Sequence, residues 1–168
     1  MLTVDEALAR LLAGVRPIQG ERVAIADALG RVPVADALTA AADVPPFANS
    51  AMDGFAVRAT DGADARRLVG ESRAGGPPAP SVEAGTAVRI MTGAPMPAGA
   101  DAVVPIEEAR ESNGTVVVES APAIGRHVRA AGLDVRQGTS VPLPRRPLAP
   151  SAIGLLAALR IPELEVRR

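Results

Sequence analysis

Short apolar runs separated by turn-forming residues fill residues 44–128, and this pattern most constrains the fold. Gly, Pro, Asp and Asn interrupt each run before it reaches the length of a typical helix. Glycine and proline number 16 each among 168 residues, so turns are enforced along the whole chain. The expected strands are Gly54–Arg58, Leu68–Glu71, Ala87–Met91, Ala102–Glu107 and Thr115–Glu119. Such spacing is typical of a small β-barrel or folded sheet.

Two helical patterns flank this β region. Residues 3–15 carry apolar side chains on one stripe, and Thr3 and Glu6 have the spacing of a capping box. A second helix, expected over residues 151–160, is apolar nearly all round, which favours burial at an interface. We therefore predict an α+β, mostly β fold. Its expected parts are a discontinuous, helix-containing outer domain, residues 1–43 plus 129–168, and an inserted small β-barrel-like domain, residues 44–128.

Composition excludes several kinds of chemistry. All 18 basic residues are arginines, cysteine is absent, and His127 is the single histidine. A lysine Schiff base, a thiolate nucleophile and a multi-histidine metal site are therefore impossible within this chain. The net charge of −1 and the scarcity of aromatic residues argue against nucleic-acid binding. No apolar run approaches the roughly 20 residues that span a bilayer, so we expect no membrane association and a cytoplasmic location.

The densest polar cluster occupies residues 45–58. Asp53 and Gly54 form a strong turn signal before an expected strand, and Asn49 and Ser50 can bond nearby amides. One interpretation is an Asx-stabilised turn that enters a hairpin. The other is a functional loop, since an exposed carboxylate on a rigid scaffold is a common way to build a site.

A second cluster spans residues 88–104, where an expected strand runs into Thr92 and Gly93. A hydroxyl beside a freed amide could form a nest for an anion. The alternative of equal weight is a hairpin loop stiffened by Pro95 and Pro97.

A third cluster spans residues 125–138, where two arginines approach one carboxylate between glycines. Arg129 or Arg136 can pair with Asp134 in a surface salt bridge of less than about 1 kcal/mol. His127 is interpreted as a packing or hydrogen-bonding residue, because the chain has no second histidine to complete a metal site.

Taken in order, these clusters resemble the molybdopterin molybdenumtransferase family, which includes bacterial MoeA and the gephyrin E domain. The resemblance spans essentially the whole chain. It is carried by Pro46-Phe47-x-Asn49-Ser50-Ala51-Met52-Asp53-Gly54-Phe55-Ala56-Val57-Arg58, Val88-Arg89-Ile90-Met91-Thr92-Gly93-Ala94-Pro95-x-Pro97, Gly99-Ala100-Asp101-Ala102-Val103-Val104, Gly132-x-Asp134 and Ile153-Gly154-Leu155-Leu156.

The resemblance implies an enzyme that inserts molybdate into adenylylated molybdopterin with the help of Mg²⁺ and works as a homodimer of about four domains per chain. This chain resembles the first two of them; the pterin- and molybdate-binding domain and the C-terminal domain are expected to be absent. Residues 164–168 are interpreted as a linker or a strand that leaves the domain. By the resemblance, the catalytic candidates are Asp53, Thr92 and Asp134, and the substrate-binding candidates are Asn49, Ser50 and Gly93. No metal ligands are assigned.

Two positions depart from the family pattern. Leu133 stands where the family has a glutamate, which removes one carboxylate beside Asp134. Arg160 stands where a glycine usually ends the last helix, so a left-handed residue there would cost about 1 kcal/mol. Arg89 and Arg129 are the expected cationic neighbours of the site. Two alternatives remain, a non-catalytic dimerisation or scaffold module of the same family and an unrelated β-barrel that binds a small molecule.

Overall fold

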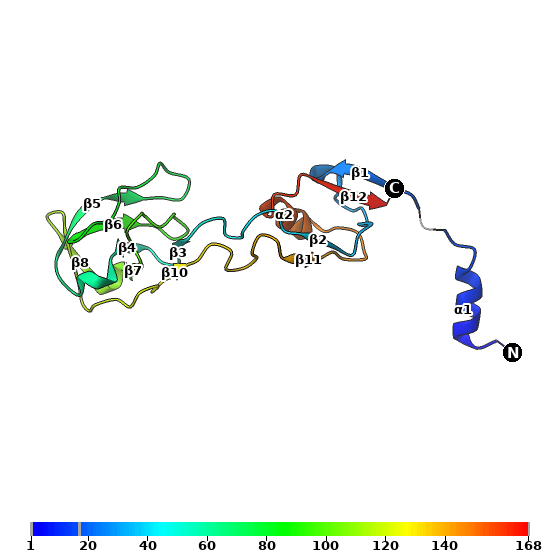
Figure 1. Ribbon diagram of the computed structural model, residues 1–168, viewed down its shortest axis with the longest axis horizontal. Helices are drawn as coiled ribbons and strands as arrows, with labels where there is room; N and C mark the ends of the chain where they lie inside the picture. Colours follow the sequence, from blue (N-terminus) through cyan, green and yellow to red (C-terminus); the bar gives the residue numbers. More distant parts are fainter. Residues whose placement is uncertain (1, 17, 168) are drawn as a thin grey trace. The chain divides into compact units, whose positions relative to one another are not determined.

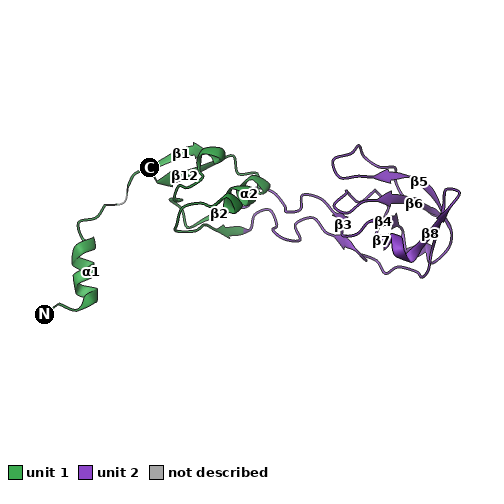
Figure 2. Ribbon diagram, turned by 180° about the vertical axis from the view of Figure 1, so that it is seen from behind, with its two compact units in different colours: residues 1–39, 140–168 green, residues 40–139 purple. Residues whose placement is uncertain are grey.

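The computed structural model describes residues 2–16 and 18–167, and it is mostly β with two α-helices (Figure 1). The chain forms two compact units, coloured separately in Figure 2. Unit 1 runs up to Thr39 and resumes at Ser140, while unit 2 is the continuous stretch Ala40–Thr139. Unit 2 exceeds the expected inserted domain at both ends because its two terminal segments bond to each other. Ala40 N–H donates to the Thr139 carbonyl oxygen at 2.9 Å.

The described residues of unit 1 form two helices, one 3-10 turn and two small antiparallel sheets. Its elements are α1 (Val4–Leu12), β1 (Gly20–Ala24), η1 (Ile25–Asp27), β2 (Ala37–Thr39), β11 (Ser140–Pro142), α2 (Pro150–Ala158) and β12 (Glu163–Arg167). Strand β1 pairs with β12, and β2 pairs with β11. Its core is built from Ala28, Leu143, Leu148, Leu156, Leu164 and Val166. Of the two interpretations of residues 164–168, the strand is confirmed for residues 164–167 and the linker is wrong, because these residues belong to β12, which pairs with β1 in unit 1.

Helix α1 begins at the expected capping box. The Glu6 N–H donates to Thr3 Oγ1 at 3.2 Å, and Glu6 Oε2 accepts from the Thr3 N–H at 2.8 Å. These reciprocal bonds satisfy two of the orphan donors at a helix start. The helix is shorter than the expected span of 3–15, and none of its described residues is buried.

Helix α2 ends at Ala158 and is followed, after its C-cap Leu159, by a residue in the left-handed region. Arg160 has φ 57°, and the next residue, Ile161, donates its N–H to the Leu156 carbonyl oxygen at 3.0 Å. This geometry normally selects glycine, because a Cβ crowds the carbonyl oxygen there. The expected strain at Arg160 is therefore present in the structure.

Unit 2 is built on a curled six-stranded sheet with the strand order β7-β4-β6-β5-β9-β8. Its elements are β3 (Asn49–Ser50), β4 (Gly54–Val57), η2 (Ala59–Asp61), β5 (Arg66–Ser72), β6 (Thr86–Ile90), β7 (Ala102–Pro105), η3 (Ile106–Glu108), β8 (Ala109–Ser112), β9 (Thr115–Val118) and β10 (Val128–Arg129). Strands β5 and β6 are parallel, and the other pairs in the sheet are antiparallel. The short strands β3 and β10 form a separate pair.

The central strands of this sheet are buried on both faces. On β4, Phe55 and Val57 belong to one apolar cluster, whereas Ala56 belongs to a second cluster on the other face. All four residues of β4 are buried, as are all four of β7. Such strands appear in the sequence as continuous apolar runs, which is why they were predictable. The expected strand 102–107 ends earlier, because residues 106–108 turn into η3.

Candidate functional site

Strand β3 joins the three sequence clusters into one patch of unit 2. On one side, Asn49 faces Arg129 and Ser50 faces Val128 of strand β10. On the other side, the Gly93 N–H donates to the Ser50 carbonyl oxygen at 2.8 Å. Segments 45–58, 88–104 and 125–138 therefore meet along a strand of only two residues, each held by backbone hydrogen bonds.

Asp53 is the carboxylate at the centre of this patch. Its Oδ1 atom accepts two hydrogen bonds from Thr92, at 2.6 Å from the backbone N–H and 2.7 Å from the hydroxyl. The Thr92 hydroxyl, and then its N–H, lower the pKa of Asp53, because both bonds stabilise the charged carboxylate. No hydrogen bond from the described residues reaches Asp53 Oδ2. An ionised oxygen on an exposed residue is thus available to a partner.

The expected anion nest at Thr92 and Gly93 is not open. Both Thr92 donors are taken by Asp53, and the Gly93 N–H is taken by Ser50. The nest binds the carboxylate of this chain in place of an external anion. Thr92 consequently fixes Asp53, and the exposed Asp53 keeps one carboxylate oxygen that accepts no hydrogen bond from the described residues.

Asn49 and Ser50 lie beneath this surface. Both are buried; the Asn49 amide donates to the Phe47 carbonyl oxygen at 3.2 Å. The Ser50 hydroxyl donates to the Met52 carbonyl oxygen at 2.6 Å and accepts from the Met52 N–H at 3.2 Å. These bonds shape the turn that presents Asp53. A direct contact of Asn49 or Ser50 with substrate stays a prediction, as does one of Gly93.

Asp134 lies beside the same patch, paired with Arg129 as expected. Arg129 Nη2 is 3.0 Å from Asp134 Oδ2 and 3.3 Å from Oδ1, and both side chains are about half exposed, at 46% and 52%. An exposed pair of this kind contributes less than about 1 kcal/mol to stability. The Asp134 N–H donates to the Val44 carbonyl oxygen at 2.9 Å. Leu133, in the position of the family glutamate, is 59% exposed.

Arg89 does not neighbour the candidate carboxylates. Its guanidinium forms an ion pair with Glu111 and lies 5.1 Å from the centroid of the Phe55 ring. The causes of the lowered pKa of Asp53 include no cation, which agrees with this placement. Arg89 thus ties β6 to β8 and caps the apolar cluster around Phe55.

Two supporting residues escaped the sequence analysis. Ser72 is buried, and its hydroxyl donates to the Pro95 carbonyl oxygen at 2.7 Å, which holds the loop after Thr92. Asp43 Oδ1 accepts from the Gln137 N–H at 2.7 Å and steadies the segment after Asp134. A small polar residue at the end of a strand was the only signal for Ser72, and no local pattern identifies the partner of Asp43.

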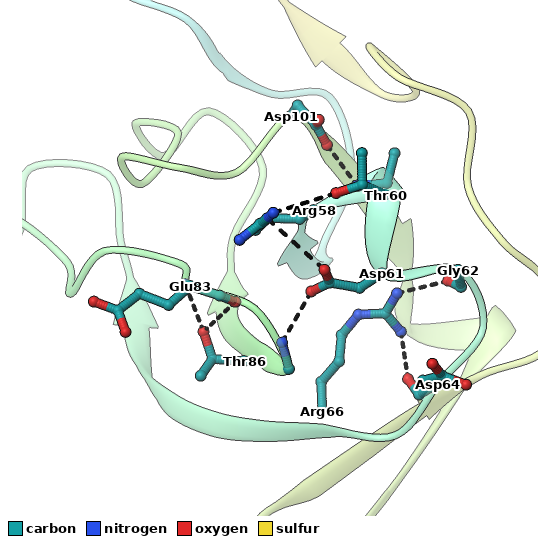
Figure 3. A network of polar contacts seen from close by, with 11 residues as sticks. Arg58, Thr60, Asp61, Gly62, Asp64, Arg66, Glu83, Thr86 and Asp101 are labelled. Atoms are coloured by element: carbon teal, nitrogen blue, oxygen red, sulfur yellow. Dashed lines mark hydrogen bonds and ion pairs between the residues drawn. The ribbon is translucent and has the colours of Figure 1, made fainter.

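A larger polar network lies elsewhere in unit 2, around η2 (Figure 3). Asp101 Oδ1 accepts from the Ala59 N–H at 2.7 Å, and Asp61 Oδ2 accepts from the Gly85 N–H at 3.0 Å. The fully buried Arg66 donates to the carbonyl oxygens of Gly62 and Asp64 at 2.6 and 2.7 Å. These carboxylates and this guanidinium bind backbone groups, so the network is structural.

Among residues 2–16 and 18–167, no group of three or more Asp, Glu or His side chains is close enough together to hold a metal ion. No helix in the same residues has the length and apolar character needed to cross a membrane.

Comparison with known proteins identifies the family. Residues 2–159 match the family model described as MoeA N-terminal region (domain I and II). The chain is 37% identical over 172 residues to the molybdopterin molybdenumtransferase of Haemophilus influenzae, covering 100% of this chain and 42% of that protein. It is 37% identical over 169 residues to molybdopterin molybdenumtransferase 2 of Mycobacterium tuberculosis, covering 96% of this chain and 41% of that protein.

The fold agrees with these sequence matches. The crystal structure of the molybdopterin biosynthesis MoeA protein from Pyrococcus horikoshii OT3 matches with a TM-score of 0.85 and 30% identity, over 99% of this chain and 46% of that one. The chain therefore spans less than half the length of the curated relatives and of the solved structure that it matches. Because the family model covers nearly all of its residues, the chain belongs to the MoeA N-terminal family, domains I and II.

Proposed function

We propose that this chain is the amino-terminal part of a molybdopterin molybdenumtransferase, which inserts molybdate into adenylylated molybdopterin in molybdenum cofactor biosynthesis. The observation that carries the proposal is the double hydrogen bond from Thr92 to Asp53, which presents an ionised carboxylate where the family motifs meet. Family membership supports the reaction assigned to it. We place the protein in the cytoplasm and propose that units 1 and 2 are its outer and inserted domains.

In this proposal, Asp53 acts on the phosphate end of the substrate. Its free Oδ2 can accept a proton from an attacking water or bind a cation that carries the phosphate. Thr92 keeps the carboxylate ionised and holds its orientation, because its two donors stabilise the charged form more than the neutral one. Asp134, held by Arg129, is the second carboxylate of the site. The remaining groups would come from parts of the family's fold that lie outside the matched region.

The residues present fit Mg²⁺ only in part. Mg²⁺ usually binds one or two carboxylates, substrate phosphates and several waters. Asp53 can supply one such carboxylate oxygen, and among the described residues no third acid or histidine joins a cluster around it. Any Mg²⁺ at this site would therefore be held mainly by substrate and by water, and it would neutralise phosphate charge there.

The test is an insertion assay in a reconstituted enzyme. The chain is joined to the remaining residues of the Haemophilus influenzae relative, and molybdate insertion is measured for the parent, Asp53→Ala and Asp27→Ala. Asp27 lies in η1 of unit 1, so Asp27→Ala is the matched control for loss of one carboxylate. We expect at least a tenfold lower rate for Asp53→Ala alone. An unchanged rate for Asp53→Ala in an active parent would contradict the proposal.

A second candidate function, a dimerisation module, is favoured by the outer face of α2. Its exposed residues carry no charge, although they lie on the surface of unit 1. They are Pro150, Ser151, Gly154, Leu155, Ala157 and Ala158. Small residues allow close helix approach, so this face suits a second copy of the chain in a homodimer.

Sedimentation equilibrium tests the dimer independently of the reaction. The parent is expected to be dimeric at micromolar concentrations, and Leu155→Glu is expected to be monomeric because it buries a charge in the contact. Leu133→Glu, at an exposed leucine in unit 2, is the control and should remain dimeric. A monomeric parent, or a dimer unaffected by Leu155→Glu, would rule out this face.

A further inference from the structure

The parallel strands of the sheet bring Ser72 next to residues 91–95, the Thr92 loop. Strands β5 and β6 run parallel, so both end at the same edge of the sheet. Strand β5 ends at Ser72, which faces Ile90, and β6 ends at Ile90, two residues before Thr92. The end of β5 therefore lies beside the start of the Thr92 loop, although the two are distant in the sequence.

A register shift within β5 selects Ser72 for this place. The paired residues of β5 and β6 advance in step up to Leu68, and one residue of β5 is then skipped before Gly70. Without this shift, Glu71 would face Ile90 in place of Ser72. A shift of one residue exchanges the faces on which the following side chains lie. Ser72 consequently shares the buried side of the sheet end with Ile90, and the two are 2% and 0% exposed.

Ser72 is hydrogen-bonded to both ends of the Thr92 loop. The Met91 N–H donates to the Ser72 carbonyl oxygen at 3.2 Å, and the Ser72 hydroxyl donates to the Pro95 carbonyl oxygen at 2.7 Å. Inside the loop, the Ala94 N–H donates to the Met91 carbonyl oxygen at 3.0 Å and closes a turn. Thr92 therefore lies between two points that one buried residue holds.

The exposed part of the loop depends on hydrogen bonds for its position. Thr92 and Gly93 are exposed, so packing holds them little. Strand β3 holds the middle of the loop, where the Gly93 N–H donates to the Ser50 carbonyl oxygen at 2.8 Å, whereas Ser72 holds the two ends. Both Thr92 donors converge on one oxygen of Asp53, and hydrogen bonds weaken steeply as donors move out of line. A small displacement of the loop would therefore weaken at least one of these two bonds.

We propose that Ser72 is a positioning residue of the site, which holds both ends of the Thr92 loop so that the two Thr92 donors reach Asp53. Ser72 acts through Thr92 and is not itself a catalytic residue. Its role in the reaction rests on the function proposed above, whereas its effect on the loop does not. The simpler alternative is that Ser72 only satisfies a buried carbonyl and stabilises unit 2. The two accounts differ in what Ser72→Ala does to Thr92.

Thr86 provides the matched control. It is buried in the same sheet, and its hydroxyl donates to the Glu83 carbonyl oxygen at 3.0 Å and accepts from the Glu83 N–H at 2.8 Å. Thr86 begins β6, at the opposite end of that strand from the Thr92 loop. Thr86→Val therefore removes a buried hydroxyl that binds the backbone, as Ser72→Ala does, and leaves the loop intact.

Amide hydrogen exchange of this chain, followed by NMR, measures the effect on the loop. The Thr92 N–H is protected by its bond to Asp53. We expect this amide to exchange about tenfold faster in Ser72→Ala, with a smaller change at the buried Val88 in the middle of β6. Thr86→Val should produce no selective change at Thr92. Parent-like exchange of Thr92 in Ser72→Ala, or equal acceleration at Thr92 and Val88, would overturn the positioning role.

Ser72→Cys tests the same bond with a side chain of similar shape. A thiol is a weak donor, so the contact with the Pro95 carbonyl oxygen is weakened and the site remains filled. The Thr92 amide should exchange about threefold faster than in the parent, a smaller effect than that of Ser72→Ala. Parent-like exchange in Ser72→Cys would show that the loop does not depend on the hydroxyl and would contradict the proposal.

Insertion rates separate this inference from the proposed function. In the reconstituted enzyme, Ser72→Ala should lower the rate about threefold in the parent and have no further effect in Asp53→Asn, because it acts through that carboxylate. Thr86→Val should keep the parent rate. A fully active Asp53→Asn would contradict the proposed function and leave the exchange result standing. A slow Asp53→Asn with a fully active Ser72→Ala, or an equal loss from Ser72→Ala in both backgrounds, would overturn the positioning role alone.

Discussion

Thr92 donates both its backbone N–H and its hydroxyl to a single oxygen of Asp53, at 2.6 and 2.7 Å. The two residues belong to different sequence clusters and meet because the loop after β6 lies beside β3. The contact leaves the second oxygen of Asp53 exposed and keeps the carboxylate ionised. It also explains why the expected anion nest at Thr92 and the expected turn carboxylate, Asp53, form one feature.

Thr92→Val removes the hydroxyl donor and keeps the N–H. The pKa of Asp53, which lies below its ordinary value of 3.8 because of Thr92, should rise toward that value. NMR titration of the Asp53 carboxyl carbon measures this directly. Thr139→Val, at an exposed position in unit 2, should leave the Asp53 titration unchanged. An unaltered Asp53 pKa in Thr92→Val would show that the hydroxyl bond is not formed in solution.

The same contact predicts a dependence of stability on pH. A carboxyl whose folded pKa is depressed adds stability above its unfolded pKa, and this stability is lost as pH falls through the folded pKa. The stability advantage of the parent over Thr92→Val should therefore be complete above pH 3.8 and shrink below it. Urea unfolding followed by circular dichroism at several pH values measures the difference. A difference that grows on acidification would contradict the hydrogen-bond account.

Arg66→Met should destabilise unit 2. The substitution removes both donors to the carbonyl oxygens of Gly62 and Asp64, which are part-buried hydrogen bonds, and we expect a cost of about 1–3 kcal/mol. Urea unfolding midpoints followed by circular dichroism measure the loss. The neighbouring Arg67 is exposed, so Arg67→Met should change stability by less than about 0.5 kcal/mol. A larger effect at Arg67 than at Arg66 would refute the structural role of the buried guanidinium.

Arg160→Gly should stabilise unit 1. Arg160 has φ 57°, and glycine adopts that conformation without the steric cost of a Cβ, so the gain should be about 0.5–1 kcal/mol. Thermal unfolding followed by circular dichroism is the measurement. Arg146→Gly, at an exposed arginine without positive φ, provides the control and should give no gain. Loss of stability in Arg160→Gly would indicate that the arginine side chain contributes more than its backbone strain costs.

Asp134→Asn should hardly change stability, because its partner Arg129 and the carboxylate are both about half exposed. A double-mutant cycle with Arg129→Gln, read from thermal unfolding, should give a coupling of less than about 1 kcal/mol that decreases with added salt. If Asp134→Asn lowers the insertion rate while its stability is unchanged, the loss is attributable to the reaction. A salt-independent coupling well above that value would mean that the pair supports the fold.

Local patterns in the sequence predicted a large part of the fold. The capping box of Thr3 and Glu6 forms as expected, and the buried strands β4, β6, β7 and β9 lie where continuous apolar runs predicted them. Strands β2, β3, β10 and β11 were not predicted, because two or three residues are too few to display a period. The pairing of β12 was not predicted, since its partner, β1, lies more than a hundred residues earlier in the chain.

The residue types of the candidate site could be selected from the sequence, whereas their geometry could not. Asp53, Thr92 and Asp134 were selected from turn signals and from the family resemblance, and the structure places all three around β3 or the strand paired with it. The hydrogen bonds of Thr92 to Asp53 depend on long-range strand pairing, which no local pattern encodes. Arg89 was misassigned for the same reason, because Glu111 and Phe55 approach it only in the curled sheet.

A double-mutant cycle of Asp53 and Thr92, measured by the rate of molybdate insertion, tests the central claim most directly. In the reconstituted enzyme, Asp53→Asn and Thr92→Val should each lower the insertion rate, with the larger loss for Asp53→Asn. Because both residues act through one contact, the double variant should be no slower than Asp53→Asn alone. If the two rate losses multiply in the double variant, or if Asp53→Asn is fully active, the Thr92–Asp53 contact is not the centre of the site.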